Sequence, residues 1–116
     1  MTCQTVIDRV WRMLNDDGTR WPSATLVSYV NDAECEMFRM APWLFLEDGD
    51  TIDDPATIDA SSDTLALNTP YLRAYAAFVC ALALQEDGNE AANRERAAAY
   101  VAEFYTAMGL VPGAKR

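Results

Sequence analysis

The stretch from Thr69 to Asn89, TPYLRAYAAFVCALALQEDGN, decides the fold class. Thr69 and Pro70 match the N-cap and first position of a helix, where proline is tolerated because that N–H is unpaired in any case. The apolar positions that follow are Leu72, Tyr75, Ala76, Val79, Cys80, Leu82 and Ala83. They cover most of the helical circumference, and Gly88-Asn89 then breaks the pattern. The sequence therefore predicts a central, largely buried helix over residues 70–87.

Two amphipathic helices precede this stretch. In residues 2–15, apolar side chains recur at helical spacing on one face, and the turn Asn15-Asp16-Asp17-Gly18 ends the pattern. The second helix is predicted over residues 23–40, with Ser23 as its N-cap and Pro42 as its stop.

The second helix has an inner stripe and a polar remainder. Its inner positions are Leu26, Val30, Ala33, Met37 and Met40. The polar residues Asn31, Asp32, Glu34 and Glu36 are placed off that stripe. The pattern predicts one apolar face toward the core.

A fourth helix is predicted over residues 90–108, with Gly109 as the residue after its end. Because only Gly88-Asn89 separates it from the helix before, the two must be antiparallel neighbours. The four helices predict an all-α, four-helix bundle-like fold, with residues 1–116 as a single domain.

Residues 42–68 interrupt the helical pattern between the second and third helices. Loops of this length inside compact domains are usually functional, disordered or partly strand. Two β-prone runs, Trp43-Leu44-Phe45-Leu46 and Thr64-Leu65-Ala66-Leu67, predict short strands, with Asp48-Gly49-Asp50 as a turn. The sequence therefore predicts a long loop or a short β-hairpin at this point.

The negative charge of the chain is concentrated in this interruption. The formal net charge is −9 at pH 7, and no base lies between Glu47 and Asp63. The acids there are Glu47, Asp48, Asp50, Asp53, Asp54, Asp59 and Asp63. Because phosphate binding needs clustered Lys and Arg, this composition argues against sequence-independent nucleic-acid binding.

The residues needed for common catalytic chemistry are missing from the sequence. There is no histidine, no GxxxxGK[ST] phosphate loop and no CxxC pair. The acidic run does not fit an EF-hand, since Gly49 directly follows Asp48 and Asp59 occupies the place of the twelfth-position Glu. We expect no enzymatic activity, no cofactor and no metal site.

The cysteines and the N-terminus indicate a cytosolic, reduced setting for synthesis. Cys3, Cys35 and Cys80 are odd in number, far apart and embedded in apolar helical patterns. No basic stretch precedes an apolar run at the N-terminus, and no apolar run reaches the length of a membrane span. The expectation is a chain with no export signal and no membrane contact.

Two tryptophans and the C-terminal tail are candidates for contacts with partners. Trp11 is expected in the core, whereas for Trp21 and Trp43 core packing and subunit contact both remain open. Residues 110–116 form a short tail that ends in the adjacent bases Lys115-Arg116, and a frayed terminus is the simplest interpretation of it.

Several stretches taken together resemble tailed-bacteriophage head-to-tail adaptor (connector) proteins. They are Thr5-Val6-Ile7-Asp8-Arg9-Val10, Arg20-Trp21-Pro22-Ser23 leading to Tyr29-Val30-Asn31-Asp32-Ala33, Ala41-Pro42, Leu67-Asn68-Thr69-Pro70-Tyr71, and Ala92-Asn93-Arg94-Glu95-Arg96-Ala97-Ala98-Ala99-Tyr100 with Phe104. The resemblance spans nearly the whole chain and departs from the family pattern in the acidic residues 50–63.

The resemblance implies a virion structural protein at the head-tail interface, assembled in the host cytoplasm. It implies a homo-oligomeric ring of about twelve copies beneath the portal protein, with tail or nozzle proteins on the far side. DNA would pass through the central channel without sequence-specific binding. The implied contacts are a portal-docking tail (Leu110, Val111, Pro112, Lys115, Arg116), intersubunit contacts (Trp21, Trp43) and a lumen-facing or tail-facing acidic loop (Glu47, Asp48, Asp50, Asp53, Asp54).

Two alternatives from other classes remain open. The first is a small acidic helical regulator, or DNA mimic, that binds a host protein and stays monomeric or dimeric. The second is a small enzyme that would need calcium or magnesium at the acidic loop, and chelator would then lower its thermal stability.

Overall fold

Four α-helices make up most of the described chain, and the prediction of an all-α fold is confirmed. The computed structural model describes residues 1–47, 51–52, 57–86 and 91–110. The helices are α1 (Cys3–Leu14), α2 (Ser23–Met40), α3 (Leu72–Glu86) and α4 (Ala91–Leu110). Each begins and ends within two residues of its predicted ends.

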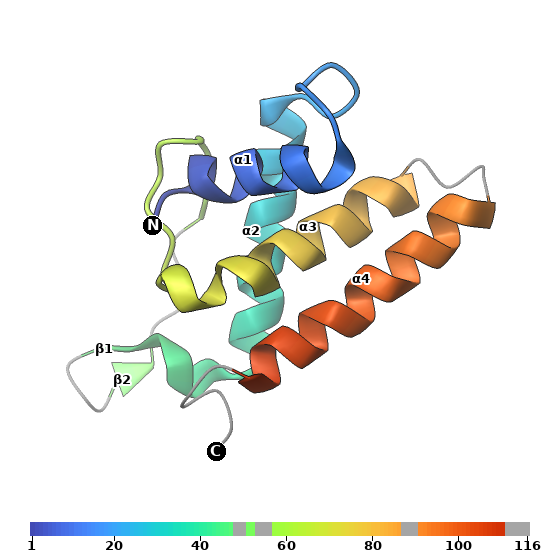
Figure 1. Cartoon of the computed structure of the whole chain (residues 1–116). Coiled ribbons are helices and arrows are strands. Elements are labelled where there is room, and N and C mark those ends of the chain that lie inside the picture. Colours follow the sequence, from blue (N-terminus) through green and yellow to red (C-terminus); the bar gives the residue numbers. More distant parts are fainter. Residues whose placement is uncertain (48–50, 53–56, 87–90, 111–116) are drawn as a thin grey trace.

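Helix α3, yellow in Figure 1, lies at the centre of the protein. Helices α1, α2 and α4 all pack against it. Nine of its fifteen residues are buried, and five of those nine are alanines: Ala74, Ala76, Ala77, Ala81 and Ala83. Because alanine projects little beyond the backbone, three helices can approach α3 closely at once.

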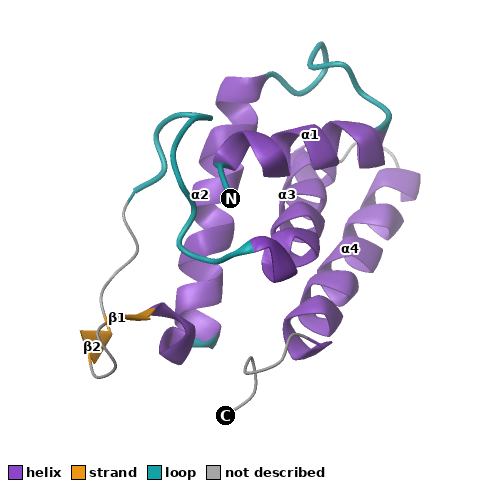
Figure 2. Cartoon of the chain, turned by 60° about the vertical axis from the view of Figure 1, so that its left-hand side comes forward, coloured by secondary structure: helices purple, strands orange, loops and turns teal. Residues whose placement is uncertain are grey.

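The four helices share one core. The side chains of Ile7 (α1), Leu26 (α2), Tyr75 (α3) and Phe104 (α4) are all almost fully buried. Helices α3 and α4 run antiparallel side by side, while α1 crosses α2 at a steep angle in both views (Figures 1 and 2). In Figure 2, α2 and α4 lie on opposite sides of α3.

The turn after α1 agrees with its prediction. Asn15 ends the helix in the left-handed conformation, with φ at 53°, and Gly18 has φ at +95°. A Cβ atom on Gly18 would lie 3.1 Å from the ring of Trp11. Glycine therefore suits this position through both its backbone conformation and its small size.

Three predicted helix ends are wrong in detail. The N-cap before the third helical segment is Asn68, and the predicted N-cap, Thr69, is already the first residue of a 3-10 helix. Pro22, rather than Ser23, occupies the N-cap position of α2, and no side chain caps that end. The Pro22 carbonyl instead accepts the N–H of Thr25 at 3.0 Å. Helix α4 continues through Gly109 to Leu110, so Gly109 does not follow the helix as predicted.

The first predicted strand is wrong in position. Residues Pro42–Phe45 form a 3-10 helix, η1. The fixed φ of proline suits such a turn, and the turn buries Phe45 against Phe38, with ring centroids 5.3 Å apart. The strands of the structure are β1 (Leu46–Glu47) and β2 (Thr51–Ile52), which pair antiparallel with Leu46 opposite Ile52.

The second predicted strand is also wrong, although its burial alternates. Leu65 and Leu67 are buried while Thr64 and Ala66 are exposed. Only Thr64 forms a β-bridge, an isolated one with Thr2. A short 3-10 helix, η2 (Thr69–Tyr71), then leads into α3.

Candidate functional site

Residues 47–68, called the acidic segment below, consist of two parts with different surroundings. In the first part, the backbone of Glu47 pairs with that of Thr51. Four acids of the predicted lumen-facing or tail-facing set lie outside the described residues: Asp48, Asp50, Asp53 and Asp54. The second part, residues 57–68, is described throughout and is called the return segment below. The orientation predicted for the first part stays a prediction.

Polar contacts fix the start of the return segment. The buried Ile58 donates its N–H to Oδ1 of Asn31 on α2, at 2.9 Å. The Asp63 carboxylate accepts the N–H groups of Asp59, at 2.8 Å, and of Ala60, at 3.0 Å. Two acids of the predicted acidic loop, Asp59 and Asp63, therefore belong to a folded turn.

The middle of the return segment binds the N-terminal end of α1. Three backbone hydrogen bonds join them: Cys3 N–H to the Asp63 carbonyl at 2.9 Å, Gln4 N–H to the Ser61 carbonyl at 2.8 Å, and Leu65 N–H to the Met1 carbonyl at 2.9 Å. The first N–H groups of a helix have no partner inside the helix. The return segment supplies that partner for two of them, so it caps α1 from a distance in sequence.

A buried carboxylate of α2 anchors the end of the return segment. Glu34 is 1% exposed, and its Oε2 accepts bonds from the Tyr75 hydroxyl at 2.9 Å and from the N–H of Ala66 at 3.1 Å. The Tyr75 hydroxyl also accepts the N–H of Leu67 at 3.3 Å. The side chains of Glu34 and Tyr75 thus accept the N–H groups of Ala66 and Leu67, which in a β-sheet would bond to a neighbouring strand.

Burial changes the acidity of both groups in this network. Desolvation raises the pKa of Glu34 above its ordinary value, and the bonds from Ala66 and Tyr75 offset part of that rise. Desolvation, together with the nearby Glu34 carboxylate, raises the pKa of Tyr75. The phenol is therefore a neutral hydrogen-bond donor at physiological pH.

The prediction that Glu34 lies off the inner stripe of α2 is wrong. Glu34 follows Val30 by four positions and precedes Met37 by three, and both of these residues are fully buried. Helical periodicity alone therefore places Glu34 toward the core. Its charge favours the solvent, but the hydroxyl of Tyr75 and the N–H of Ala66 make the inward position possible.

Trp21 lies in the core of the subunit, which leaves little of its surface for the predicted subunit contact. It is 8% exposed, and its indole N–H donates to the Ala83 carbonyl on α3 at 3.3 Å. Its own carbonyl accepts the indole N–H of Trp11 at 2.9 Å, and its backbone N–H bonds the Asp16 carboxylate. The Trp21 ring is buried and its indole N–H has an acceptor, both inside one subunit.

Trp43 lies at the opposite end of the molecule, in η1. It is half-buried and packs against the core. Figures 1 and 2 place η1, β1 and the last turn of α4 at this same end. Tyr105, near the end of α4, is 50% exposed and is the one exposed large hydrophobic residue among those described. Of the two tryptophans, Trp43 keeps the surface area for a subunit contact.

The predicted portal-docking tail begins at the end of α4. Leu110 is the last residue of that helix. The other predicted docking residues lie outside the described residues: Val111, Pro112, Lys115 and Arg116. Of the predicted tail, the structure therefore describes only the backbone of Leu110, in the last turn of α4.

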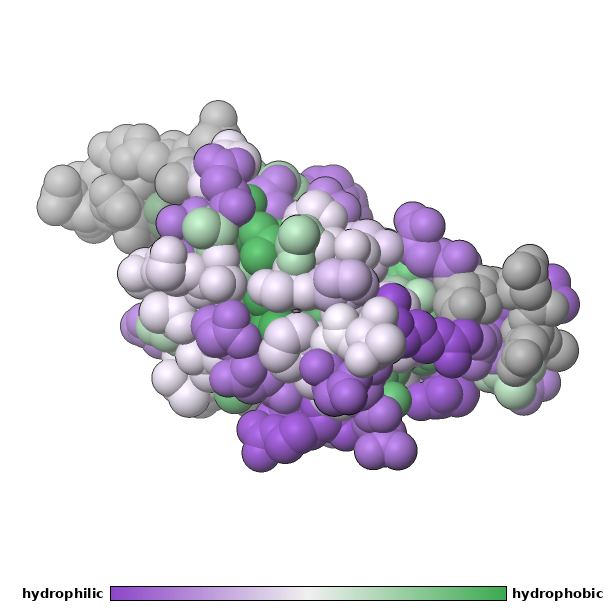
Figure 3. Space-filling view, turned by 90° about the horizontal axis from the view of Figure 1, so that it is seen from above, coloured by the Kyte–Doolittle hydropathy of each residue, from purple (hydrophilic) through white to green (hydrophobic). Residues whose placement is uncertain are grey.

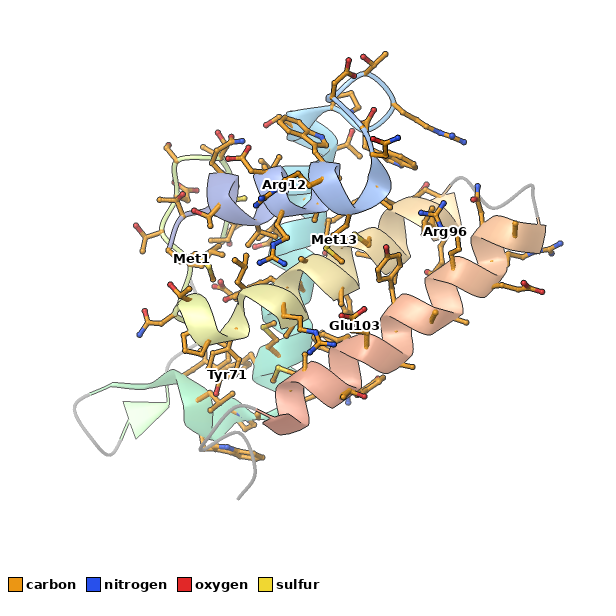
Figure 4. All side chains as sticks on the ribbon, in the orientation of Figure 1. Met1, Arg12, Met13, Tyr71, Arg96 and Glu103 are labelled. Atoms are coloured by element: carbon orange, nitrogen blue, oxygen red, sulfur yellow. The ribbon has the colours of Figure 1, made fainter. Side chains whose placement is uncertain are left out.

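The face seen from above carries mainly hydrophilic and near-neutral side chains, with few hydrophobic ones between them (Figure 3). A large apolar contact is not expected there. On the side facing the viewer in Figure 4, Arg96 and Glu103 project from α4 toward α3. The Glu103 carboxylate accepts a bond from Nε of Arg73 at 2.8 Å, which joins α3 and α4 at the surface.

Burial raises the pKa of both buried thiols, Cys3 and Cys80. Desolvation, with smaller effects of Asp63 and Glu34, raises the pKa of Cys3 to about 11. Desolvation raises the pKa of Cys80 to about 12. Glu103 raises it slightly further, and Arg96 lowers it slightly. Because the thiolate is the nucleophile and the metal ligand, neither residue suits catalysis or metal binding.

Metal and membrane sites are not found in the part of the chain that the structure describes. Within these residues, no group of three or more Cys, Asp or Glu side chains could hold a metal ion. No helix there is long and apolar enough to cross a membrane. Comparison of the chain with known protein families, with curated proteins and with solved structures found no match.

Proposed function

We propose that this chain is the head-to-tail adaptor of a tailed bacteriophage, a structural protein of the virion. About twelve copies would form a ring beneath the portal protein and connect the capsid to tail or nozzle proteins. DNA would pass through the central channel without sequence-specific binding. The proposal includes a bundle-like packing of the four helices, a short hairpin between α2 and α3, and an extended tail.

One observation carries the proposal beyond the sequence resemblance. The turn that holds Trp43, the start of the acidic segment and the end of α4 lie at one end of the helical domain (Figures 1 and 2). The last described residues before the tail and the start of the acidic segment are therefore at the same end of the helical domain. A subunit of this design can contact neighbours and a portal from one end while its core stays unchanged.

The charge of the chain fits a DNA channel. The net charge is −9, and the acids are concentrated between Glu47 and Asp63. Acidic side chains facing a channel repel the phosphates of passing DNA, so the DNA does not adhere to the wall. A sequence-independent DNA-binding role would require the opposite charge.

Binding to portal complexes tests the proposal and the docking residues together. The full chain and a chain ending at Leu110 would each be mixed with portal complexes from the same source, and the bound fraction measured by size-exclusion chromatography. We expect the full chain to bind and the shortened chain to lose binding. Arg94→Ala, an exposed change near the other end of α4, is the matched control and should bind normally.

Two outcomes would contradict different parts of the proposal. Equal binding by the shortened chain would remove the tail as the docking segment but leave the adaptor function. No binding by the full chain, together with a monomer or dimer in solution, would favour the host-binding regulator instead.

A further inference from the structure

The Glu34 carboxylate lacks the partner that a buried charge normally has. No cation lies within ion-pair distance of it among the residues that the structure describes; the ion pairs found there join Arg39 with Glu36 and Arg73 with Glu103. Its two hydrogen-bond donors, the Tyr75 hydroxyl and the Ala66 N–H, both reach Oε2. A neutral carboxyl group can keep both bonds, since its carbonyl oxygen accepts two donors.

The other titratable groups around Glu34 come from three elements. Cys3 lies on α1 and Tyr75 on α3, and both stay protonated near neutral pH because burial raises their pKa. Asp63, in the return segment, acts on Cys3 and accepts two backbone N–H bonds at the surface. None of these groups supplies a positive charge to a Glu34 carboxylate.

We propose that Glu34 is a pH-sensitive latch that holds the return segment against α2 and α3 and holds it more tightly when protonated. In the closed state the carboxyl group is buried and accepts the Ala66 N–H and the Tyr75 hydroxyl. In the open state residues 57–68 leave this surface and the carboxyl group becomes solvated. Opening also removes the carbonyl partners of the first N–H groups of α1.

The sign of the pH effect follows from the burial. The pKa of Glu34 is raised in the closed state from its ordinary value of 4.5. The closed state therefore binds the proton more tightly than the open state, and it is favoured at low pH. This advantage is present in full below pH 4.5 and is lost as the pH rises through the raised pKa. Lowering the pH should close the segment.

Amide hydrogen exchange of the full chain measures this directly. Protection factors, corrected for intrinsic exchange, would be compared between about pH 7.5 and about pH 5 for Ala66 and Leu67. In the native chain we expect protection to rise on acidification, by up to about tenfold per pH unit. In Glu34→Gln, whose amide oxygen can keep both bonds, protection should be high at both pH values and should not follow the pH.

Two variants separate Glu34 from other carboxylates. Asp32→Asn makes the same chemical change at an exposed position of α2 and should keep the pH response of the native chain. Asp63→Asn, which alters the return segment itself, should lower protection but also keep the response. If Asp63→Asn instead abolishes the response, Asp63 and not Glu34 is the titrating group, and the proposal is wrong.

The native chain alone also decides the question if Glu34→Gln does not fold. NMR of the Glu34 side-chain carboxyl carbon should then show titration above the ordinary range, in step with the change in protection. Titration at or below pH 4.5, or protection that does not change with pH, would overturn the latch.

Discussion

Helix α3 and the return segment follow one another in the chain, yet they are held in place by different forces. Nine residues of α3 are buried, and helices pack on several sides of it. The return segment buries three large apolar side chains, Ile58, Leu65 and Leu67, and otherwise depends on individual hydrogen bonds. Many small packing contacts therefore hold the helix in place, whereas a few individual hydrogen bonds determine the position of the return segment.

The largest effect is expected in the helical core. Phe104→Ala removes a fully buried ring that contacts Phe78 of α3, with ring centroids 5.1 Å apart. It should lower the free energy of unfolding by about 3–5 kcal/mol. Chemical denaturation measures this change. Tyr105→Ala, the half-exposed aromatic neighbour, is the control and should cost less than about 1 kcal/mol. Equal losses would contradict the assignment of Phe104 to the core.

A smaller and more local effect is expected at Tyr75. Tyr75→Phe keeps the ring in the core but leaves the Glu34 carboxylate and the Leu67 N–H without the hydroxyl. The free energy of unfolding should fall by about 1–3 kcal/mol. Amide exchange should accelerate mainly in residues 57–68 and much less in α4. Unchanged exchange at Leu67 would show that the hydroxyl does not hold the return segment.

The smallest effect is expected at the start of the return segment. Asn31→Ala removes the acceptor of the Ile58 N–H, and the free energy of unfolding should fall by about 0.5–1.5 kcal/mol. Amide exchange should accelerate at Ile58 and also at Leu67, because residues 57–68 leave the surface of α2 and α3 together. Asp32→Ala, on the adjacent exposed position, is the control. Acceleration at Ile58 alone would contradict the opening of the return segment as one unit.

The same contrast explains what the sequence could predict of the fold. The four helices repeat their apolar residues at helical spacing, and that signal is local, so their ends are predicted to within two residues. The return segment has no such signal, because its partners are distant. Ala66 bonds Glu34 across 32 positions, and Tyr75 bonds Glu34 across 41. Leu65 and Leu67 are buried, but nothing in residues 64–67 indicates that side chains accept the backbone N–H groups of Ala66 and Leu67.

The candidate site could be predicted only in part. Trp21 precedes Pro22 in a loop, which favours exposure, but the carbonyl of Ala83 gives its indole N–H a partner inside the core. That contact depends on how α3 packs, and no residue near Trp21 in the sequence indicates it. For Glu34 the sequence does hold a signal, because its spacing from the buried Val30 and Met37 places it on the inner face of α2. The prediction instead followed its charge, which favours exposure. The acidic residues 48, 50, 53 and 54 and the tail after Leu110 stay predictions.

The adaptor function is tested most directly by electron microscopy of the chain mixed with portal complexes from the same source. Negative-stain images, with the mass of the assembly determined in parallel, would show whether the 12.9 kDa subunits form a closed ring on the portal. We predict a ring at one end of the portal, with a mass increase of about twelve subunits. Portal particles that stay bare and unchanged in mass at saturating subunit concentration would contradict the account.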